Sequence, residues 1–117
     1  MAMFDEIITK DYRLPGHQGE GVFQTYDLGE HREFYRLDAE GKLWRYMRDA
    51  EGFARDTNLQ RRCLISKTVL MIAYVNDLYI AYEIVFENGV VKSIERTKRN
   101  NYGEHTPPFN PDEFLEE

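Results

Sequence analysis

Hydrophobic and polar residues alternate along two segments of the chain that share one design. Each has an aromatic-rich strand, a turn that contains an acidic residue and ends in glycine, and a second strand that opens with apolar residues. The first segment covers residues 33–46 and the second covers residues 82–94. Alternation with a period of two is typical of strands that bury one face. The pattern therefore predicts an antiparallel sheet built on two hairpins.

The length of the first turn predicts the register of the first hairpin. A three-residue loop that ends in Gly41, with this glycine in the left-handed conformation, places Leu37 opposite Leu43. The same register places Arg36 opposite Trp44, where a guanidinium and an indole ring can form a cation–π pair.

The second hairpin admits two registers. A two-residue turn of residues 88–89 would place Ile84 opposite Ser93, whereas a three-residue loop would place Phe86 opposite Val90. The three-residue loop brings more apolar residues face to face. We therefore expect the three-residue loop, which would give both hairpins the same turn.

The rest of the chain supplies further strands. The apolar run of residues 63–75 is rich in Val, Ile, Thr and Tyr, which favours a central strand at 68–75 paired with 78–86 across a tight turn. Residues 4–9 and 22–26 are also strand candidates, although 4–9 equally fits a helical turn. Residues 9–21, with Pro15-Gly16 and further glycines, read as an irregular loop.

These elements predict an α+β, mostly β fold with a meander-like antiparallel sheet and one or two short helices. One helix is expected within residues 50–62. Residues 1–105 are expected to form a single compact domain, followed by an acidic C-terminal tail at 106–117. A second short helix is expected to start at Asn110, because Asn caps helices and the next residue, Pro111, suits the first helical position.

The net charge of the chain restricts the classes of molecule that it is expected to bind. The chain of 117 residues has 15 Lys and Arg against 21 Asp and Glu, a formal net charge of −6. The average field repels phosphate backbones and anionic lipids, so direct nucleic-acid binding is disfavoured. The same field attracts a basic protein surface. No stretch approaches the ~20 apolar residues of a membrane helix, and the single Cys63 excludes an internal disulfide, so we expect a cytoplasmic protein with no membrane association.

No residues are predicted to be catalytic, cofactor-binding or metal-binding. The three histidines, His17, His31 and His105, lack the spacing that preorganises a metal site. Glu83 lies in the most apolar strand, but alternation assigns it to the solvated face rather than to catalysis. The Gly-rich loop lacks the Gly-Lys-Ser/Thr ending of a phosphate loop.

Five segments, in their order and spacing, resemble a family of small uncharacterised bacterial and phage proteins. The segments are residues 3–7, 12–15, 23–28, 35–37 and 41–44. The resemblance implies a phage or mobile-element context, in which small acidic proteins frequently bind host machinery. The family commonly has Lys where this chain has Tyr26, so no role of that positive charge transfers to this chain.

The leading hypothesis is therefore a non-enzymatic, acidic protein-binding module that acts on a host protein with a basic surface, such as a nucleic-acid-handling or defence complex, and inhibits it. The residues expected to form its acidic, aromatic face are Tyr26, Asp27, Glu30, Tyr35, Trp44 and Tyr46. The alternative is a small-ligand or nucleotide-binding protein that uses the loop of residues 9–21.

Overall fold

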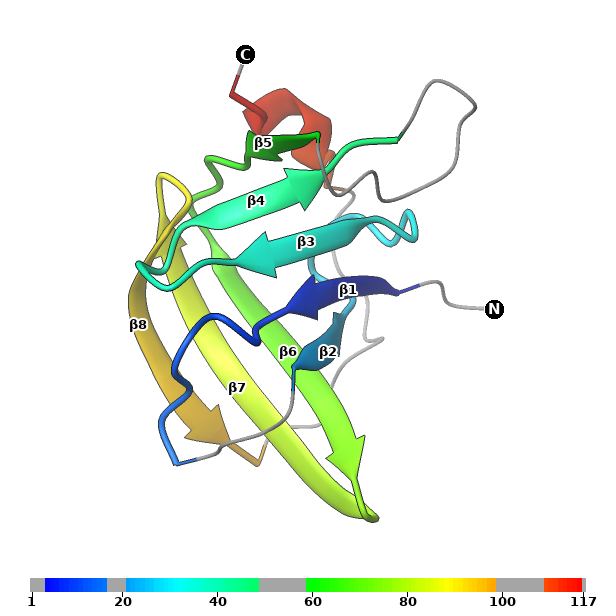
Figure 1. Ribbon diagram of the computed structural model, residues 1–117, viewed down its shortest axis with the longest axis vertical. Helices are drawn as coiled ribbons and strands as arrows, with labels where there is room; N and C mark the ends of the chain where they lie inside the picture. The colour runs from blue at the N-terminus through cyan, green and yellow to red at the C-terminus, as the bar shows by residue number, and fades with distance from the viewer. Residues whose placement is uncertain (1–3, 17–20, 49–58, 99–108, 117) are drawn as a thin grey trace.

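The computed structural model describes residues 4–16, 21–48, 59–98 and 109–116. The elements within these residues are β1 (Asp5–Ile8), β2 (Val22–Thr25), β3 (Phe34–Leu37), β4 (Leu43–Tyr46), β5 (Gln60–Arg62), β6 (Thr68–Val75), β7 (Leu78–Glu87), β8 (Val90–Thr97) and the 3₁₀ helix η1 (Pro111–Phe114). The strands form one sheet in the order β5-β4-β3-β1-β2-β6-β7-β8 (Figure 1). The prediction of a mostly β fold is confirmed.

The sheet is mixed, which corrects the prediction of a purely antiparallel meander. β1 lies between β2 and β3 and runs parallel to β3, with Ile7 beside Tyr35. The chain reverses direction between β1 and β2 and again between β2 and β3, so β3 takes the direction of β1 when it adds to the far edge of β1. Local hydrophobic alternation does not encode this return across the sheet.

The first hairpin has the predicted register. Leu37 lies opposite Leu43 and Arg36 lies opposite Trp44. Gly41 has the expected positive φ, at +84°, because the loop must turn back within three residues.

The second hairpin turns in two residues, so the preferred three-residue loop is wrong. Asn88 and Gly89 both have positive φ, at 50° and 75°, and Glu87 lies opposite Val90. Two consecutive left-handed residues match the twist of the flanking strands, which makes Asn-Gly a favoured pair in such turns.

A β-bulge then changes the register of β7 and β8. Lys92 is the additional residue, so Val85 lies opposite Ser93 and Ile84 lies opposite Ile94. Neither sequence-based register includes these pairs. The bulge allows the tight turn and still places two isoleucines against each other.

The predicted strand pair of residues 68–75 and 78–86 is confirmed as β6 and β7, which continues to Glu87. The first strand is also confirmed as β1. The predicted helix at residues 50–62 is wrong at its C-terminal end, because residues 60–62 form β5 along the edge of β4. The remaining residues of that prediction up to 58 lie outside the described part of the chain.

The two hairpins meet at their turns. The Leu43 N–H donates to the Gly89 carbonyl at 2.8 Å, and the Val91 N–H donates to the Gly41 carbonyl at 2.9 Å. Because β4 and β8 lie near opposite ends of the strand order, these bonds require the sheet to curl round on itself (Figure 1). The curled sheet encloses the core, whose largest fully buried side chains include Phe23, Tyr35, Leu37, Leu43, Ile65, Met71, Tyr82 and Ile80.

Candidate interaction surfaces

Two of the six residues predicted to contact a partner are buried. Tyr35 is fully buried, and the exposed fraction of Tyr46 is 7%. Tyr35 lies beside Ile7 of β1, and strand alternation places both side chains on the core face. Neither tyrosine therefore lies on an exposed face, whereas the other four predicted residues are partly exposed.

Trp44 lies in a row of side chains across three strands. The Arg36 guanidinium on β3 lies 5.8 Å from the indole centre, and the Arg62 guanidinium on β5 lies 5.6 Å from it. The predicted Arg36–Trp44 cation–π pair is thus confirmed. The indole N–H donates to Asp38 Oδ2 at 3.0 Å, and Arg36 Nε donates to Gln60 Oε1 at 2.9 Å. These contacts hold the row together and bind the edge strand β5 to the sheet.

Tyr26, Asp27 and Glu30 share the loop between β2 and β3. A carboxylate at the start of β1 holds this loop. Asp5 Oδ1 accepts the N–H of Glu33 at 2.8 Å and of His31 at 3.2 Å, and Oδ2 accepts the N–H of Glu30 at 3.0 Å. Burial raises the pKa of Asp5 above its usual value, although the three N–H groups oppose that rise.

Asp27 fixes the other end of the same loop. Its Oδ2 accepts the Leu70 N–H of β6 at 2.7 Å, and its carbonyl accepts from Lys67 Nζ at 2.6 Å. The Lys67 ammonium lies 4.0 Å from the ring centre of Phe109, and desolvation lowers its pKa. Asp27 therefore binds the loop to β6 and contributes to the fold.

The C-terminal segment docks along the outer edge of β5. The Leu64 N–H donates to the Phe114 carbonyl at 2.8 Å, and the Glu116 N–H donates to the Arg62 carbonyl at 2.8 Å. Between them, Leu115 forms a bridge with Cys63. The segment thus covers a sheet edge that would otherwise present free N–H and C=O groups.

η1 begins as its sequence predicts. The Asn110 side chain accepts the Asp112 N–H at 3.1 Å, and Pro111 follows the cap. The Arg45 side chain of β4, 9% exposed, forms an ion pair with Asp112. The edge pairing and this ion pair were not predicted. The sequence contains one sign of the ion pair. Arg45 lies opposite the buried Tyr35, so alternation places a charged side chain on the buried face of β4, where it needs a partner of opposite charge.

The β2–β3 loop and the C-terminal segment touch each other. A Cβ placed on Gly29 would come within 2.9 Å of the Phe109 carbonyl oxygen and 3.0 Å of Pro111 Cδ. The Phe109 ring stacks on Phe114, with centres 5.6 Å apart and planes inclined by 13°. Glycine at position 29 therefore permits the close approach of two segments that are distant in the sequence.

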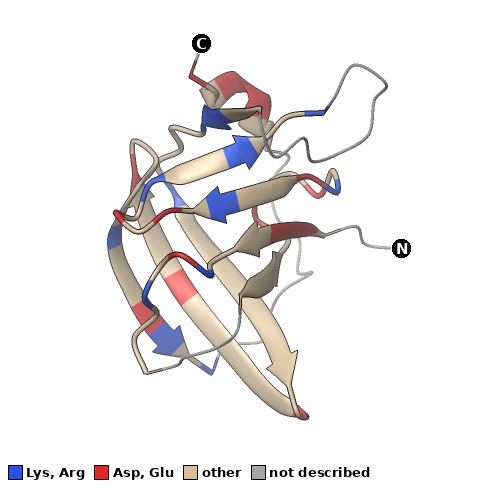
Figure 2. Ribbon diagram, in the orientation of Figure 1, with Lys and Arg blue, Asp and Glu red and all other residues tan. Residues whose placement is uncertain are grey.

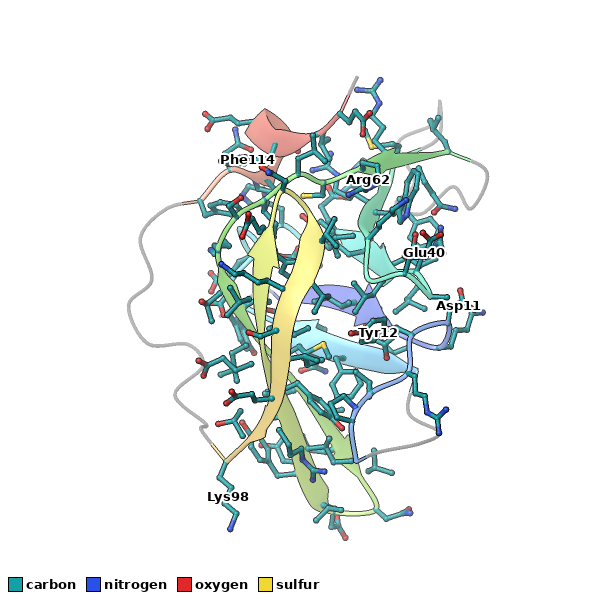
Figure 3. The ribbon with its side chains drawn as sticks, turned by 90° about the vertical axis from the view of Figure 1, so that its left-hand side faces the viewer. Asp11, Tyr12, Glu40, Arg62, Lys98 and Phe114 are labelled. Carbon is teal, nitrogen blue, oxygen red and sulfur yellow. The ribbon has the colours of Figure 1, made fainter. Side chains whose placement is uncertain are left out.

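Acidic residues and an exposed aromatic side chain occur together on the C-terminal segment and the adjoining β2–β3 loop. We define the acidic surface as Glu30, Asp112, Glu113, Phe114 and Glu116. Phe114 is 38% exposed, and Glu113 and Glu116, which precede and follow it in the sequence, are also exposed. Figure 2 shows the acidic residues along η1, above the basic residues of β4 and β5, and Figure 3 shows Phe114 at the end of the molecule opposite Lys98.

The described residues contain no group of three or more His, Cys, Asp or Glu that could hold a metal ion. Burial raises the pKa of the Cys63 thiol to about 11, so the thiol is neutral near pH 7 and is a poor nucleophile. His17 and His105 lie outside the described residues. Across the described parts of the chain, no helix is long and apolar enough to cross a membrane.

The described part of the loop after β1 packs against the rest of the fold. Leu14 is 4% exposed and belongs to the core, and Tyr12 packs against the core. The Tyr82 hydroxyl donates to the Pro15 carbonyl at 2.7 Å. Figure 3 shows Tyr12 between β8 and the turn at Glu40. These contacts give no specific support to the alternative of ligand binding by the loop of residues 9–21.

Comparisons of this chain with protein-family models, with curated proteins and with solved structures gave no match.

Proposed function

We propose that the protein is a non-enzymatic protein-binding module that docks through the acidic surface on a basic surface of a host protein. The observation that carries the proposal is the setting of Phe114, which remains 38% exposed although it is fixed by the Phe109 ring and by its carbonyl bond to Leu64. A rigid aromatic ring loses little conformational entropy on binding, and aromatic anchors often dominate interface energy.

The charges around Phe114 define the chemistry of the partner. Glu113 and Glu116 flank Phe114 in the sequence and are exposed, and the whole chain has a net charge of −6. Opposite charges around an apolar contact accelerate association and suppress wrong partners. The partner surface should therefore hold an apolar pocket with Lys or Arg at its rim.

The resemblance to small bacterial and phage proteins extends the proposal to a target class. On that basis we propose inhibition of a host nucleic-acid-handling or defence complex, whose basic groove normally binds a polyanion. An acidic protein that occupies such a groove inhibits by competition and needs no catalytic group.

The test is affinity capture from a bacterial lysate with the tagged full chain, read out by mass spectrometry. The variant Phe114→Ser/Glu113→Lys should lower recovery of the specific target at least about tenfold, the loss expected when a central aromatic anchor is removed. The matched control is Leu78→Ser/Glu95→Lys, which also changes one exposed apolar and one exposed acidic residue, on β7 and β8 rather than on the acidic surface. Equal recovery with both variants would refute the proposal.

A further inference from the structure

Few main-chain bonds attach the C-terminal segment, residues 109–116, to the sheet. Within the described residues, one runs from the Leu64 N–H to the Phe114 carbonyl and the other from the Glu116 N–H to the Arg62 carbonyl. Figure 1 shows η1 beside β5, the first strand in the order of the sheet. β6, by contrast, pairs with β7 along all 8 of its residues. The segment is therefore an addition at one edge, and its removal breaks no pairing between β1 and β8.

Contacts within the segment link its two ends. The Phe109 ring stacks on Phe114, with ring centres 5.6 Å apart. Between them, the Asn110 side chain caps η1, and the Glu113 N–H donates to the Asn110 carbonyl at 3.3 Å. The end that meets the β2–β3 loop is thus joined to the end that bonds to the edge of the sheet. We therefore expect the contacts of both ends to form and break together, as in other local cooperative units.

The ion pair that holds the segment includes an unsatisfied polar atom. Arg45 of β4 is 9% exposed and pairs with Asp112 of the segment. Arg45 Nε is buried without a hydrogen-bond partner in the protein, as is the Oη of Tyr35 on the neighbouring strand. Burial of a polar atom without such a bond costs free energy. Water can reach the guanidinium once Asp112 moves away, so detachment of the segment relieves part of this cost.

Docking of the segment assembles the acidic surface. Four of the five residues of this surface lie on the segment, whereas Glu30 lies on the β2–β3 loop. The two parts meet at Gly29, where an added Cβ would lie 2.9 Å from the Phe109 carbonyl oxygen. Docking also fixes Phe114 through the bond of its carbonyl to Leu64. Detachment therefore separates Glu30 from the other acidic residues and releases Phe114 from its fixed position.

We propose that the C-terminal segment is a displaceable strap that gates the acidic surface. The strap detaches from β5 as one unit while the other strands stay paired, and only the docked form presents Phe114 in a fixed position. The gating of a partner rests on the function proposed above, whereas detachment is a property of the free protein. A partner that binds only the docked form stabilises it, so binding and docking are linked equilibria.

The test of detachment is hydrogen exchange of the free full chain, measured by NMR in increasing, sub-denaturing urea. The Leu64 and Glu116 amides should have equal opening constants, at least about tenfold larger than that of the Leu43 amide, which donates to Gly89. Their exchange should depend weakly on urea because detachment exposes little surface, whereas exchange of Leu43 should follow global unfolding. The same urea dependence for all three amides would overturn the proposal, as would unequal opening constants for Leu64 and Glu116.

Two glycine variants provide a matched comparison. Gly29→Ala places a methyl group against the Phe109 carbonyl and Pro111 and changes no charged residue, so it should raise both opening constants at least about tenfold. Gly16→Ala has similar backbone strain, with φ of +73° against +99°, but its Cβ meets no atom within 4 Å. This variant should leave both opening constants unchanged. Equal effects of the two variants would mean that Gly29 does not hold the strap.

The gate is tested with the host protein recovered in the capture experiment. Added at a free concentration of about ten times its Kd, that protein should lower the opening constants of Leu64 and Glu116 about tenfold. Unchanged opening constants would refute the gate, because binding would then be independent of docking. If capture recovers no specific protein, the proposed function and the gate fail together, whereas detachment measured on the free chain still stands.

Discussion

The main-chain N–H of Leu43 donates a 2.8 Å hydrogen bond to the carbonyl of Gly89, and this contact joins the two hairpins at their turns. The Gly89 N–H in turn donates to the Ile65 carbonyl at 2.8 Å. The backbone at position 89 therefore lies against two other segments, and only a residue without a side chain fits there.

We predict that Gly89→Ala is among the most destabilising single substitutions in this chain. The new Cβ would lie 2.3 Å from the Cys63 carbonyl oxygen, at a position where φ is +75°. Conformational strain costs about 1–2 kcal/mol, and the clash with backbone adds to it. Urea denaturation should give a loss of at least about 3 kcal/mol in the free energy of unfolding.

Gly16→Ala is the matched control for Gly89→Ala. Gly16 has almost the same φ, +73°, but no atom lies within 4 Å of the position that its Cβ would take. This variant should show the conformational strain alone, about 1 kcal/mol. Equal losses for the two variants would mean that the close approach of Gly89 to Cys63 has no energetic consequence.

Asp38 should stabilise the first hairpin in a pH-dependent way. Desolvation is the largest single influence and raises its pKa, but hydrogen bonds from the Trp44 indole and the Lys42 and Glu40 N–H groups together hold the pKa below 3.8. The ionised form is thus favoured in the folded state. The contribution of Asp38 to the free energy of unfolding is complete above pH 3.8 and is lost as the pH falls through the lowered pKa.

We predict that Asp38→Asn costs about 1–2 kcal/mol near neutral pH, since it weakens hydrogen bonds to a charged acceptor. The difference in stability between wild type and variant should shrink below pH 3.8. Fluorescence of Trp44, the single tryptophan, reports unfolding directly. A difference that stays constant from neutral to strongly acidic pH would contradict the assignment.

Local sequence patterns predicted the local parts of the fold. The register of Leu37 with Leu43 follows from one turn and one alternating pattern, and the cap at Asn110 follows from two adjacent residues. The bulge at Lys92 depends on a balance between turn geometry and packing farther along the hairpin. The parallel placement of β1 beside β3, where Asp5 accepts the Glu33 N–H, joins residues distant in the sequence and has no local signature.

The candidate site was harder to predict for a related reason. A period of two divides a strand into two faces, but it does not tell which face is buried when both contain aromatic residues. Tyr35 was therefore assigned to a surface although it is in the core. Four members of the acidic surface are near neighbours in the sequence, but Glu30 joins them only through the close approach of Gly29 to Pro111. Gly29 and Pro111 are far apart in the sequence, and such contacts cannot be inferred from one sequence.

Asp5 should show the opposite pH dependence to Asp38. Burial raises its pKa above 3.8 in the folded state, so the folded protein binds a proton more strongly than the unfolded chain. Stability linked to this group therefore decreases as pH rises from 3.8 through the raised pKa. The variant Asp5→Asn has no ionisable group at this position, so its stability does not show this decrease.

The expected result for Asp5→Asn is a stability cost relative to wild type that is larger near pH 4 than near pH 7. Urea denaturation of both proteins at each pH gives this difference. The contributions of the other carboxylates to the pH dependence cancel, because both proteins contain them. A cost that instead grows toward neutral pH would mean that the N–H groups of Glu30, His31 and Glu33 outweigh desolvation in setting the pKa.

The ion pair of Arg45 with Asp112 should couple the C-terminal segment to the sheet. Arg45 is nearly buried, so Asp112→Asn leaves its desolvated guanidinium without a charged partner. This variant should lower the free energy of unfolding by about 2 kcal/mol. Arg45→Met keeps the apolar stem and removes the charge, and Asp112→Asn should then cost little. A double-mutant cycle measured by urea denaturation should give a coupling of about 1–2 kcal/mol. Coupling near zero would mean that Leu115 and the backbone bonds alone hold the segment on β5, with Asp112 acting only as a solvated charge.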